Sequence, residues 1–577
     1  MKIAIAAALA ACTVSCGRTD GEFQFDLLTT NDVHGSWFDS TYVGGGVRNS
    51  LMAVNSYVKA FRDSLGKDNV ILFDAGDCLQ GDNAAYFSNY VDTLSPHLYP
   101  RLAKYMGYDA VCVGNHDVET GHRVYDRVAA ELKAAGIPFL GGNAVRPDGK
   151  RYFETCRILK RGGVRIALLG YTNPNMKAWL DESLWSGMTF ESLIPLVQED
   201  VDRIIEKEHP HVVIVGVHSG TGRGDGSIYE SQGLDLFKTL HGVDFLVCSH
   251  DHSAVVYKQD SICLINSGSR AQNIGHGRVK LTLKGGKVVA KTVDADLIKV
   301  NADKADSAME AAFHPDFLKV KAFTSREVGG LDTDLNTRDS YSGMCPYMNL
   351  IHTLSLSGSH AQISFAAPLT FNGKVKAGTL IYNDLFTIYP YENQLFVVKM
   401  TGAEIRRYLE YSYETWIQTY VKGGHVLRIA SGEDQRTGQS RWHFVNRSYN
   451  FDSAAGIVYD VDVTRPYGER VSIRSMSDGT PFSPDSWYNV AMTSYRAAGG
   501  GELLSKGAGI AADEMDSRIV ARYPEIRNML YDYIRKNGGI RASEIGNEDV
   551  IGHWEFVPAS AASAIAADME LLFGSIR

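Results

Sequence analysis

Several short apolar segments in the first half of this chain end abruptly in polar side chains. VCVGNHD, residues 111–117, is one of them, and the others end in NDVHG, GDCLQG, VHSG and SHDH. Segments with helical spacing of apolar residues, such as 50–64 and 124–135, lie between the apolar runs. This alternation predicts an α/β layered domain, in which ligands bind at the carboxyl ends of the strands. We therefore expect the five polar ends to converge on one site.

The polar ends carry imidazole, carboxylate and amide groups, a mixture that suits borderline divalent metals. One histidine at a strand end is more often a hydrogen-bonded surface residue, but five such ends in succession are hard to obtain by chance. Seven ligands are too many for one tetrahedral ion, and they suffice for two ions that share a bridging carboxylate. The predicted ligands are Asp32, His34, Asp77, Asn115, His218, His250 and His252.

The length of 577 residues predicts two large domains. Residues 301–330 are predicted to form a connecting helix. Beyond residue 331 the pattern of apolar residues changes. Strand-like segments are FVVKM, IVYDVDV and WYNVAM, and a helix-like segment is GAEIRRYLEYSYETW. This mixture favours an α+β domain. The net charge of -9 excludes a basic surface for a nucleic-acid duplex. Cys78, Cys112, Cys248 and Cys263 are interpreted as buried free thiols, because no CxxC pair occurs.

The N-terminus, MKIAIAAALAACTVSCG, resembles a bacterial lipoprotein signal. Cys12 has the better preceding residues and Cys16 leaves a longer apolar region, so either is a candidate for lipid attachment. A plain cleaved signal without lipid is the alternative. We expect an exported protein of the bacterial cell envelope, in the periplasm or at the cell surface. Residues 1–16 are assigned to the signal region, and a lipid anchor is the only membrane contact expected.

The blocks NDVHG, GDCLQG, GNHD, VHSG and SHDH resemble the signature blocks of calcineurin-like metallophosphoesterases, and among these the 5'-nucleotidase family. The similarity runs from about residue 23 to 559, with Ser249 where glycine is more frequent. It implies a four-layer α/β/β/α catalytic domain at 23–300 and an α+β substrate-binding domain at 331–559. Residues 560–577 are left as a tail.

Carried over residue by residue, the resemblance implies two divalent metal ions, such as Zn, Mn or Mg. Asp32, His34 and His252 would hold one ion. Asn115, His218 and His250 would hold the second, with Asp77 as the bridge. Two such ions can clamp the attacking and leaving oxygens of a phosphoryl transfer and activate a water, which attacks without a covalent phosphoenzyme.

The resemblance also implies that His116 faces the phosphate and not the metals, where it supports charge or the leaving group. A carboxylate would orient its ring and raise its pKa. Glu119 has the position of the family's orienting acid, while Asp117 is adjacent to His116 and is the other candidate. His122 is interpreted as structural.

The second domain contains YPYENQL, 389–395, and SYRAAGGGELL, 494–504, which resemble the nucleoside-binding segments of the family. Tyr391 and Tyr495 would stack on the two faces of the base, and Asn393 would read its edge. Stacking is worth about 1–3 kcal/mol and tolerates any base. Half-buried packing is the ordinary role of a tyrosine in a chain with 29 of them. The glycines at Gly499 and Gly500 favour the binding role, since they let the backbone approach a ligand closely.

One departure concerns an arginine. Strict 5'-nucleotidases carry a GGGIR-like segment that helps hold the substrate, and the equivalent AAPLTFNGKVKAG contains no arginine. This stretch, with YRAAGGG, IRNMLYDYIRKNGGI and HWEFVP, looks more like the 2',3'-cyclic-nucleotide 2'-phosphodiesterase/3'-nucleotidase branch. Arg338 and Arg496 are candidates for a replacement charge clamp.

We therefore predict an exported, metal-dependent nucleotide phosphohydrolase. Its ester is either a 5'-monoester or a 2',3'-cyclic diester followed by its 3'-monoester. A non-catalytic surface nucleotide-binding protein is the remote alternative, disfavoured because all seven ligands are present. Nucleotides are the expected partners, whereas the native metals, the preferred base and the oligomeric state stay open.

Overall fold

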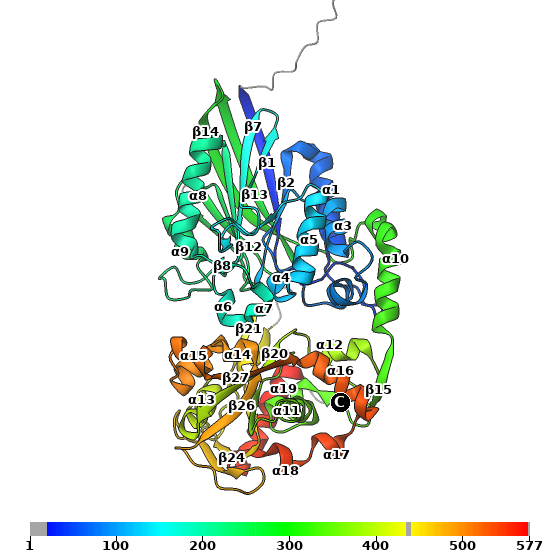
Figure 1. Cartoon of the computed structure of the whole chain (residues 1–577), viewed down its shortest axis with the longest axis vertical. Helices are drawn as coiled ribbons and strands as arrows, with labels where there is room; N and C mark the ends of the chain where they lie inside the picture. The colour runs from blue at the N-terminus through cyan, green and yellow to red at the C-terminus, as the bar shows by residue number, and fades with distance from the viewer. Residues whose placement is uncertain (1–19, 260, 434–439, 575–577) are drawn as a thin grey trace, which may run out of the picture.

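The computed structural model describes residues 20–259, 261–433 and 440–574. The predicted signal region, with Cys12 and Cys16, lies outside these ranges. Two domains stand one above the other, joined at one side by helix α10 (Ser307–Thr324), as Figure 1 shows. In the described part of the chain, no helix has the length and apolar character needed to cross a membrane.

The N-terminal domain is built on two six-stranded sheets. The first has the order β14 (Lys287–Lys299), β13 (Asn273–Lys284), β1 (Gly21–Thr30), β2 (Val70–Asp74), β3 (Ala110–Cys112) and β4 (Phe139–Leu140). The second has the order β11 (Ala254–Gln259), β12 (Ile262–Ser267), β10 (Phe245–Cys248), β9 (Val212–Val217), β7 (Val164–Tyr171) and β6 (Cys156–Arg161). The central strands of each sheet run parallel, so their carboxyl ends gather at one edge.

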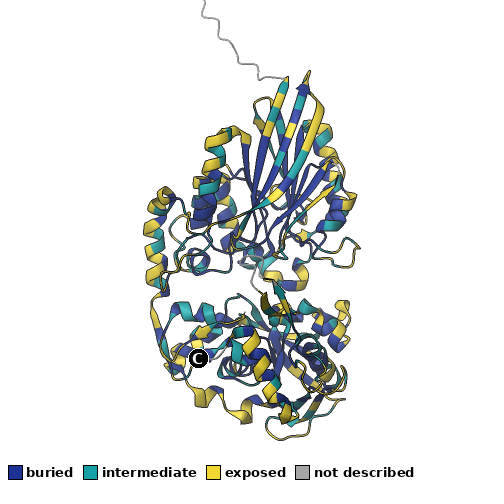
Figure 2. Ribbon diagram, turned by 180° about the vertical axis from the view of Figure 1, so that it is seen from behind, coloured by how far each residue is buried: buried dark blue, intermediate teal, exposed yellow. Residues whose placement is uncertain are grey.

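A dry core lies between the two sheets and explains the continuous apolar runs of the sequence, because these strands are buried on both faces. Phe25, Phe73, Ile214 and Val247 are among its members. Helices α1 (Leu51–Leu65), α3 (Leu98–Met106) and α5 (His122–Ala134) pack on the outer face of the first sheet. Helices α8 (Leu193–Glu208) and α9 (Gly233–Thr239) pack on the second. The expected four-layer α/β/β/α arrangement is confirmed, and Figure 2 shows its buried strands between partly exposed helices.

The C-terminal domain is α+β, as expected. Its central sheet has the order β23 (Ser453–Ala455), β17 (Ile363–Ala366), β26 (Trp487–Thr493), β20 (Gln394–Thr401) and β27 (Ile519–Glu525). Helix α13 (Gly402–Trp416) packs on one face of this sheet. Helices α11 (Pro346–Ser359), α12 (Tyr382–Ile388) and α16 (Ile526–Asn537) pack on the other.

Smaller strands complete the C-terminal domain. One three-stranded sheet has the order β19 (Gly378–Ile381), β15 (Glu327–Leu331) and β28 (Gly539–Ile540). Another has the order β25 (Val471–Met476), β24 (Ile457–Asp462) and β29 (Gly552–Val557). Because β15 begins at Glu327, strand pairing within this domain starts slightly before residue 331.

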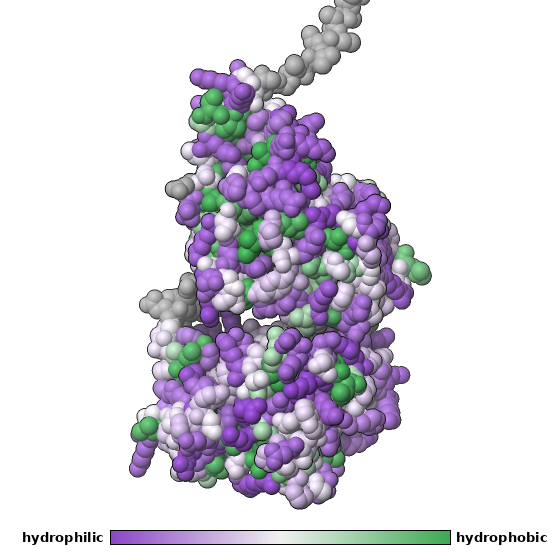
Figure 3. All heavy atoms as spheres, turned by 60° about the vertical axis from the view of Figure 1, so that its left-hand side comes forward, coloured by the Kyte–Doolittle hydropathy of each residue, from purple (hydrophilic) through white to green (hydrophobic). Residues whose placement is uncertain are grey.

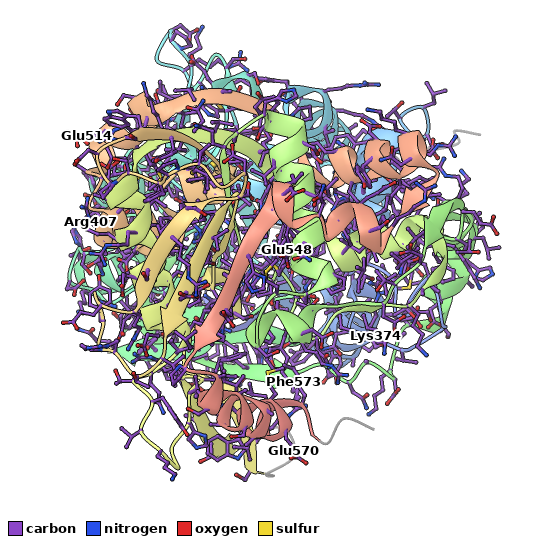
Figure 4. The ribbon with its side chains drawn as sticks, turned by 90° about the horizontal axis from the view of Figure 1, so that it is seen from below. Lys374, Arg407, Glu514, Glu548, Glu570 and Phe573 are labelled. Atoms are coloured by element: carbon purple, nitrogen blue, oxygen red, sulfur yellow. The ribbon has the colours of Figure 1, made fainter. Side chains whose placement is uncertain are left out.

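The segment after residue 559 folds as part of the C-terminal domain, where the sequence was interpreted as a tail. Helix α19 (Ala562–Phe573) buries Ile565, Met569 and Leu572 in the domain core. The ring of Phe573 stacks on that of Tyr341, with 5.9 Å between centroids. Figure 4 shows this helix from below, with Glu570 and Phe573 labelled. Apolar spacing in ASAIAADMELLF was the signal for it.

The two domains touch through a segment that follows β2. In this segment, helix α2 (Asn83–Tyr86) carries Asn83, whose Nδ2 donates to Asn383 Oδ1 at 3.0 Å. The Tyr86 hydroxyl donates to Asn528 Oδ1 at 3.3 Å, and its ring packs among Phe323, Tyr382 and Phe386. Elsewhere Figure 3 shows a furrow between the domains.

Candidate metal centre and active site

The predicted metal ligands meet at the carboxyl edge of the two sheets. Ligand atoms of Asp32, His34 and His252 lie within 4.8 Å of one another, as do those of Asp32, Asp77 and His218. Asn115 joins the second group, because its Oδ1 lies 3.0 Å from His218 Nε2 and 2.9 Å from His250 Nδ1. All seven residues are thus brought together in two groups, and Asp32 is common to both, whereas Asp77 lies in the second.

The backbone at this edge is bent in an unusual way. Among the described residues, ten that are not glycine have positive φ. Five of these are predicted ligands, namely Asp32, His34, Asp77, His250 and His252, with φ between 47° and 69°. Such conformations cost about 1–3 kcal/mol each and persist only where the surroundings enforce them. Their concentration here marks a built site, in which the bends aim successive side chains at a common centre.

Backbone hydrogen bonds hold these bends in place. The amide of Asp32 donates to the Gly76 carbonyl at 2.9 Å, and the amide of His34 donates to the Asp77 carbonyl at 2.9 Å. The amide of His250 donates to Asp32 Oδ2 at 2.9 Å. The strand ends after β1, β2 and β10 therefore fix one another.

The two candidate carboxylates beside His116 have different partners. Glu119, at the end of helix α4 (Asn115–Glu119), places Oε2 at 2.5 Å from Nδ1 of His116. Asp117 is buried and accepts hydrogen bonds from backbone amides at 2.8–3.0 Å, those of Asp77, Cys78, Leu79 and Gly114. Glu119 therefore orients the imidazole, whereas Asp117 shapes the loop that carries Asp77.

Gly114 is required by this same loop. A Cβ atom at residue 114 would overlap Oδ1 of Asp77, so no side chain fits there. The Asp77 carboxylate also accepts from the backbone amide of His116 at 2.8 Å. The glycine of GNHD thus lets Asp77 reach the edge of the site.

The predicted ligands differ in their ionisation. Burial lowers the pKa of His218, but the Asp77 carboxylate outweighs this and raises the pKa to about 9, so a cation would displace a proton from this ring. Burial lowers the pKa of His250 to about 3 and that of His252 to about 4, so both rings are neutral and free to bind a metal. Burial raises the pKa of Asp32 to about 8, and the neighbouring carboxylate of Asp77 acts in the same direction. The imidazole, carboxylate and amide donors of this set fit divalent ions.

His116 has the opposite character. Burial by itself lowers its pKa, but the carboxylates of Asp77 and Glu119 outweigh this and raise the pKa to about 10. Its ring lies edge-on to that of His34, with 5.4 Å between centroids. The two carboxylates thus favour the imidazolium form of His116, which lies beside the predicted metal ligands.

Two residues to which the sequence analysis gave no role contact the predicted ligands. The departure at Ser249 places its Oγ 3.0 Å from His218 Nδ1 and lets it donate to the Ala75 carbonyl, also at 3.0 Å. Trp179, at the end of α6 (Met176–Trp179), stacks on His250 with 5.0 Å between centroids. Groups that hold metal ligands in this way fix ring orientation. His122, by contrast, pairs with Asp126 and Tyr152 away from the ligands.

The predicted nucleoside residues lie on the side of the C-terminal domain that faces this centre. Tyr391 is half-buried in the loop between α12 and β20. Tyr495 belongs to α14 (Ser494–Ala497), which contacts α6 of the catalytic domain. A Cβ atom at Gly500 would overlap the ring of Tyr495, and Gly499 has φ of 95°. Asn393 accepts from the Ile526 amide through its carbonyl, at 3.0 Å.

The two predicted clamp arginines occupy other places. Arg496 is buried and donates to Asp452, Asn450 and the carbonyls of Tyr449 and Gly500. Arg338 lies beside Asp339 and lines a cavity of about 590 Å³ whose other wall includes α19 residues such as Met569 and Phe573. We therefore leave both arginines out of the site. Arg496 was a candidate because it lies next to Tyr495 in the sequence. That position does not reveal that its guanidinium binds Asp452.

Comparisons with known proteins agree with this fold. Residues 321–506 match the model of the 5'-nucleotidase C-terminal domain. The chain resembles the 5'-nucleotidases in both domains. Residues 27–260 also match the model described as bacterial capsule synthesis protein PGA_cap.

Individual relatives cover most of the chain at low identity. The trifunctional nucleotide phosphoesterase protein YfkN of Bacillus subtilis is 21% identical over 93% of this chain, which spans only 39% of that protein. A 2',3'-cyclic-nucleotide 2'-phosphodiesterase/3'-nucleotidase of Yersinia enterocolitica is 22% identical, over 87% of this chain and 84% of its own. A solved Staphylococcus aureus structure, assigned as a 5'-nucleotidase, has a TM-score of 0.75 at 20% identity and covers 92% of this chain and 99% of its own. The fold is thus that of the 5'-nucleotidases.

Proposed function

We propose that this chain is a metal-dependent hydrolase that releases phosphate from nucleotides. The observation that carries the proposal is the convergence of seven ligand side chains beside the His116–Glu119 pair, on the edge that faces the C-terminal domain. Relatives named for nucleotide phosphoester hydrolysis match along most of the chain, which supports the substrate class.

The metal site would have two parts. Asp32, His34 and His252 would hold one divalent cation. Asn115, His218 and His250 would hold the other, with Asp77 shared. When bound, the two cations would supply Lewis-acid charge to the phosphoryl oxygens and an acidified water as nucleophile. The number and identity of the ions are part of the proposal.

His116 would act on the phosphate itself. Its Nδ1 is taken by Glu119, so a proton on Nε2 is available to a substrate oxygen. As an imidazolium, the ring would stabilise charge on the phosphoryl oxygens and donate a proton to the departing alkoxide. Glu119 keeps the ring in this orientation.

The nucleoside would bind between the domains. Tyr391 and Tyr495 would stack on the base, Asn393 would read its edge, and the backbone at Gly499 and Gly500 would pass close to the ligand. Since Tyr495 is 37% exposed, its ring has a surface available for stacking. Broad base specificity would follow from this mode of binding.

The ester is either a 5'-monoester, supported by relatives named 5'-nucleotidase, or, as the second candidate, a 2',3'-cyclic diester followed by its 3'-monoester. The second is supported by the absence of arginine in AAPLTFNGKVKAG and by relatives named for that activity. Phosphate release from 5'-AMP, 3'-AMP and 2',3'-cyclic AMP, each with Mn, Zn or Mg, separates the two. Turnover of 5'-AMP alone would exclude the cyclic activity. Nucleotide binding without turnover under any metal would instead indicate a non-catalytic binding protein.

The protein would act outside the cytoplasm, attached by lipid at Cys12 or Cys16. Support comes from the signal-like N-terminal sequence. Metabolic labelling with a radioactive fatty acid tests this in the C12S and C16S variants. Loss of label in one variant would identify the modified cysteine, and no label in the unmodified chain would leave a plain cleaved signal.

A further inference from the structure

The active-site edge presents one arginine that neither sequence pattern nor resemblance singled out. Arg270 follows β12 in the catalytic domain, and its side chain is exposed. Within residues 20–259, 261–433 and 440–574, its guanidinium has no hydrogen bond or ion pair. It differs in this from Arg496, whose donors are bound to Asp452 and its neighbours. Arg270 is therefore a cation that is free to meet a ligand.

The backbone of Arg270 is built into the metal centre. Its amide donates to the carbonyl of the predicted ligand Asp32 at 2.8 Å. Arg270 and the buried Ala271 are both left-handed, with φ of 52° and 55°. Two successive residues in this conformation, neither of them glycine, are costly and need enforcement by their surroundings. Arg270 is hydrogen-bonded to Asp32, one of the five left-handed ligands, so the turn that aims Asp32 also fixes the base of the Arg270 side chain.

The charge of Arg270 reaches both halves of the site. The Arg270 charge acts on His34, His252 and Tyr391, so its guanidinium lies within electrostatic reach of all three side chains. His34 and His252 belong to the metal centre, whereas Tyr391 belongs to the C-terminal domain. The guanidinium thus lies near the path from the cations to the predicted base site, where the phosphate of a nucleotide would have to pass.

We propose that Arg270 binds the phosphoryl oxygens of the substrate. It would take the place of the arginine that is missing from AAPLTFNGKVKAG in the C-terminal domain. This inference rests on the proposed function, because it takes a phosphate ester as the ligand. A guanidinium offers paired N–H donors that match two phosphoryl oxygens, a geometry that lysine cannot reproduce. The catalytic domain, and not the substrate domain, would then supply the phosphate clamp.

The test compares R270A, R270Q and R270K with the parent protein, all loaded with metal. We expect kcat/KM for the preferred nucleotide, and also for 4-nitrophenyl phosphate, to fall about 10- to 100-fold in R270A and R270Q. Calorimetry should show inorganic phosphate bound more weakly by a similar factor, while inhibition by adenosine stays unchanged. R270K should recover only part of the loss.

Bound metal and the melting temperature decide whether Arg270 acts on the ligand or on the fold. Both should stay at the parent level in all three variants. R535A, which removes an exposed arginine from the last turn of α16, is the matched control and should change neither kcat/KM nor phosphate binding.

A dissociation constant for inorganic phosphate in R270A within twofold of the parent value would overturn the proposal. A loss of bound metal in R270Q would also overturn it, because Arg270 would then support the turn at Asp32 and not bind the ligand. Absence of turnover in the parent protein would refute the proposed function instead. The phosphate titration would still decide the role of Arg270 in that case.

Discussion

Glu119 and His116 form a pair across one turn of helix α4, with 2.5 Å between Oε2 and Nδ1. Asp117, between them in sequence, turns the other way and accepts from backbone amides of the Asp77 loop. One short segment thus carries two carboxylates with separate tasks, and substitution distinguishes them.

E119Q should lower kcat about 10- to 100-fold with bound metal unchanged, because the imidazole loses its charged partner and its fixed orientation. D117N should instead lower the bound metal and the melting temperature, since an asparagine carbonyl cannot accept from all the amides that the carboxylate serves, and each amide left without a partner costs about 1–3 kcal/mol. Steady-state kinetics and metal analysis on the same samples measure both. A loss of metal in E119Q would contradict this division.

Removal of the cations should destabilise the catalytic domain. The predicted ligands are buried and bent, and without cations the carboxylates of Asp32 and Asp77 crowd one another. At a metal concentration about 1,000 times the dissociation constant, binding stabilises by about 4 kcal/mol, which corresponds to a melting temperature about 5–10 °C higher. Calorimetry with and without a chelator measures this shift, and added Mn should restore it. H122A should show the same shift as the parent, since His122 lies away from the ligands.

We expect Arg496 to stabilise the fold and not to bind the substrate. Its guanidinium is buried against Asp452, with 2.7 Å between Nη2 and Oδ1. R496A would leave that carboxylate buried without a partner, so the free energy of unfolding should fall by about 3–5 kcal/mol. Urea titration measures the loss, and R338A is the surface counterpart with little expected change. A stable R496A protein with a raised KM would restore the clamp interpretation.

His352 gives the C-terminal domain an acid-sensitive point far from the metals. The ring is buried between Ser364 Oγ, 2.8 Å from Nδ1, and Ser453 Oγ, 3.1 Å from Nε2. Burial lowers its pKa to about 3. Its contribution is therefore complete above the unfolded value near 6.5 and is lost as pH falls toward 3. Between pH 7 and pH 5, the parent should lose about 2 kcal/mol more unfolding free energy than H352Q, as measured by urea titration. Equal losses would contradict this.

The sequence predicted the catalytic architecture well, because parallel strands buried on both faces give unbroken apolar runs. FDLLTT, for instance, lies in β1, and the helix expected at 50–64 is α1, Leu51–Leu65. The free thiols were also confirmed, since Cys78, Cys112, Cys248 and Cys263 are buried and unpaired. The convergence of the predicted ligands could be anticipated from sequence because these residues stand where the strands end.

Features that depend on contacts between distant segments were not predictable. Arg496 is buried because Asp452, 44 positions away, lies across from it. Trp179 reaches His250 from a short helix with no strong pattern. Arg270 looks like any surface arginine until the turn after β12 is placed against Asp32. Local spacing contains no information on such pairings, which the fold alone creates.

The short distance in sequence between Asp77 and helix α2 has a mechanical consequence. Asn83 lies six positions after Asp77 and is bonded to Asn383 of the other domain, while Tyr86 is held by Asn528. A rotation that carries Asn383 and Asn528 away from α2 breaks these bonds and frees the far end of the Asp77 loop. Domain opening and cation affinity are then thermodynamically linked, so that each must change the other by the same factor. Separation of the two domains should therefore cost more free energy when cations are bound than when they are not.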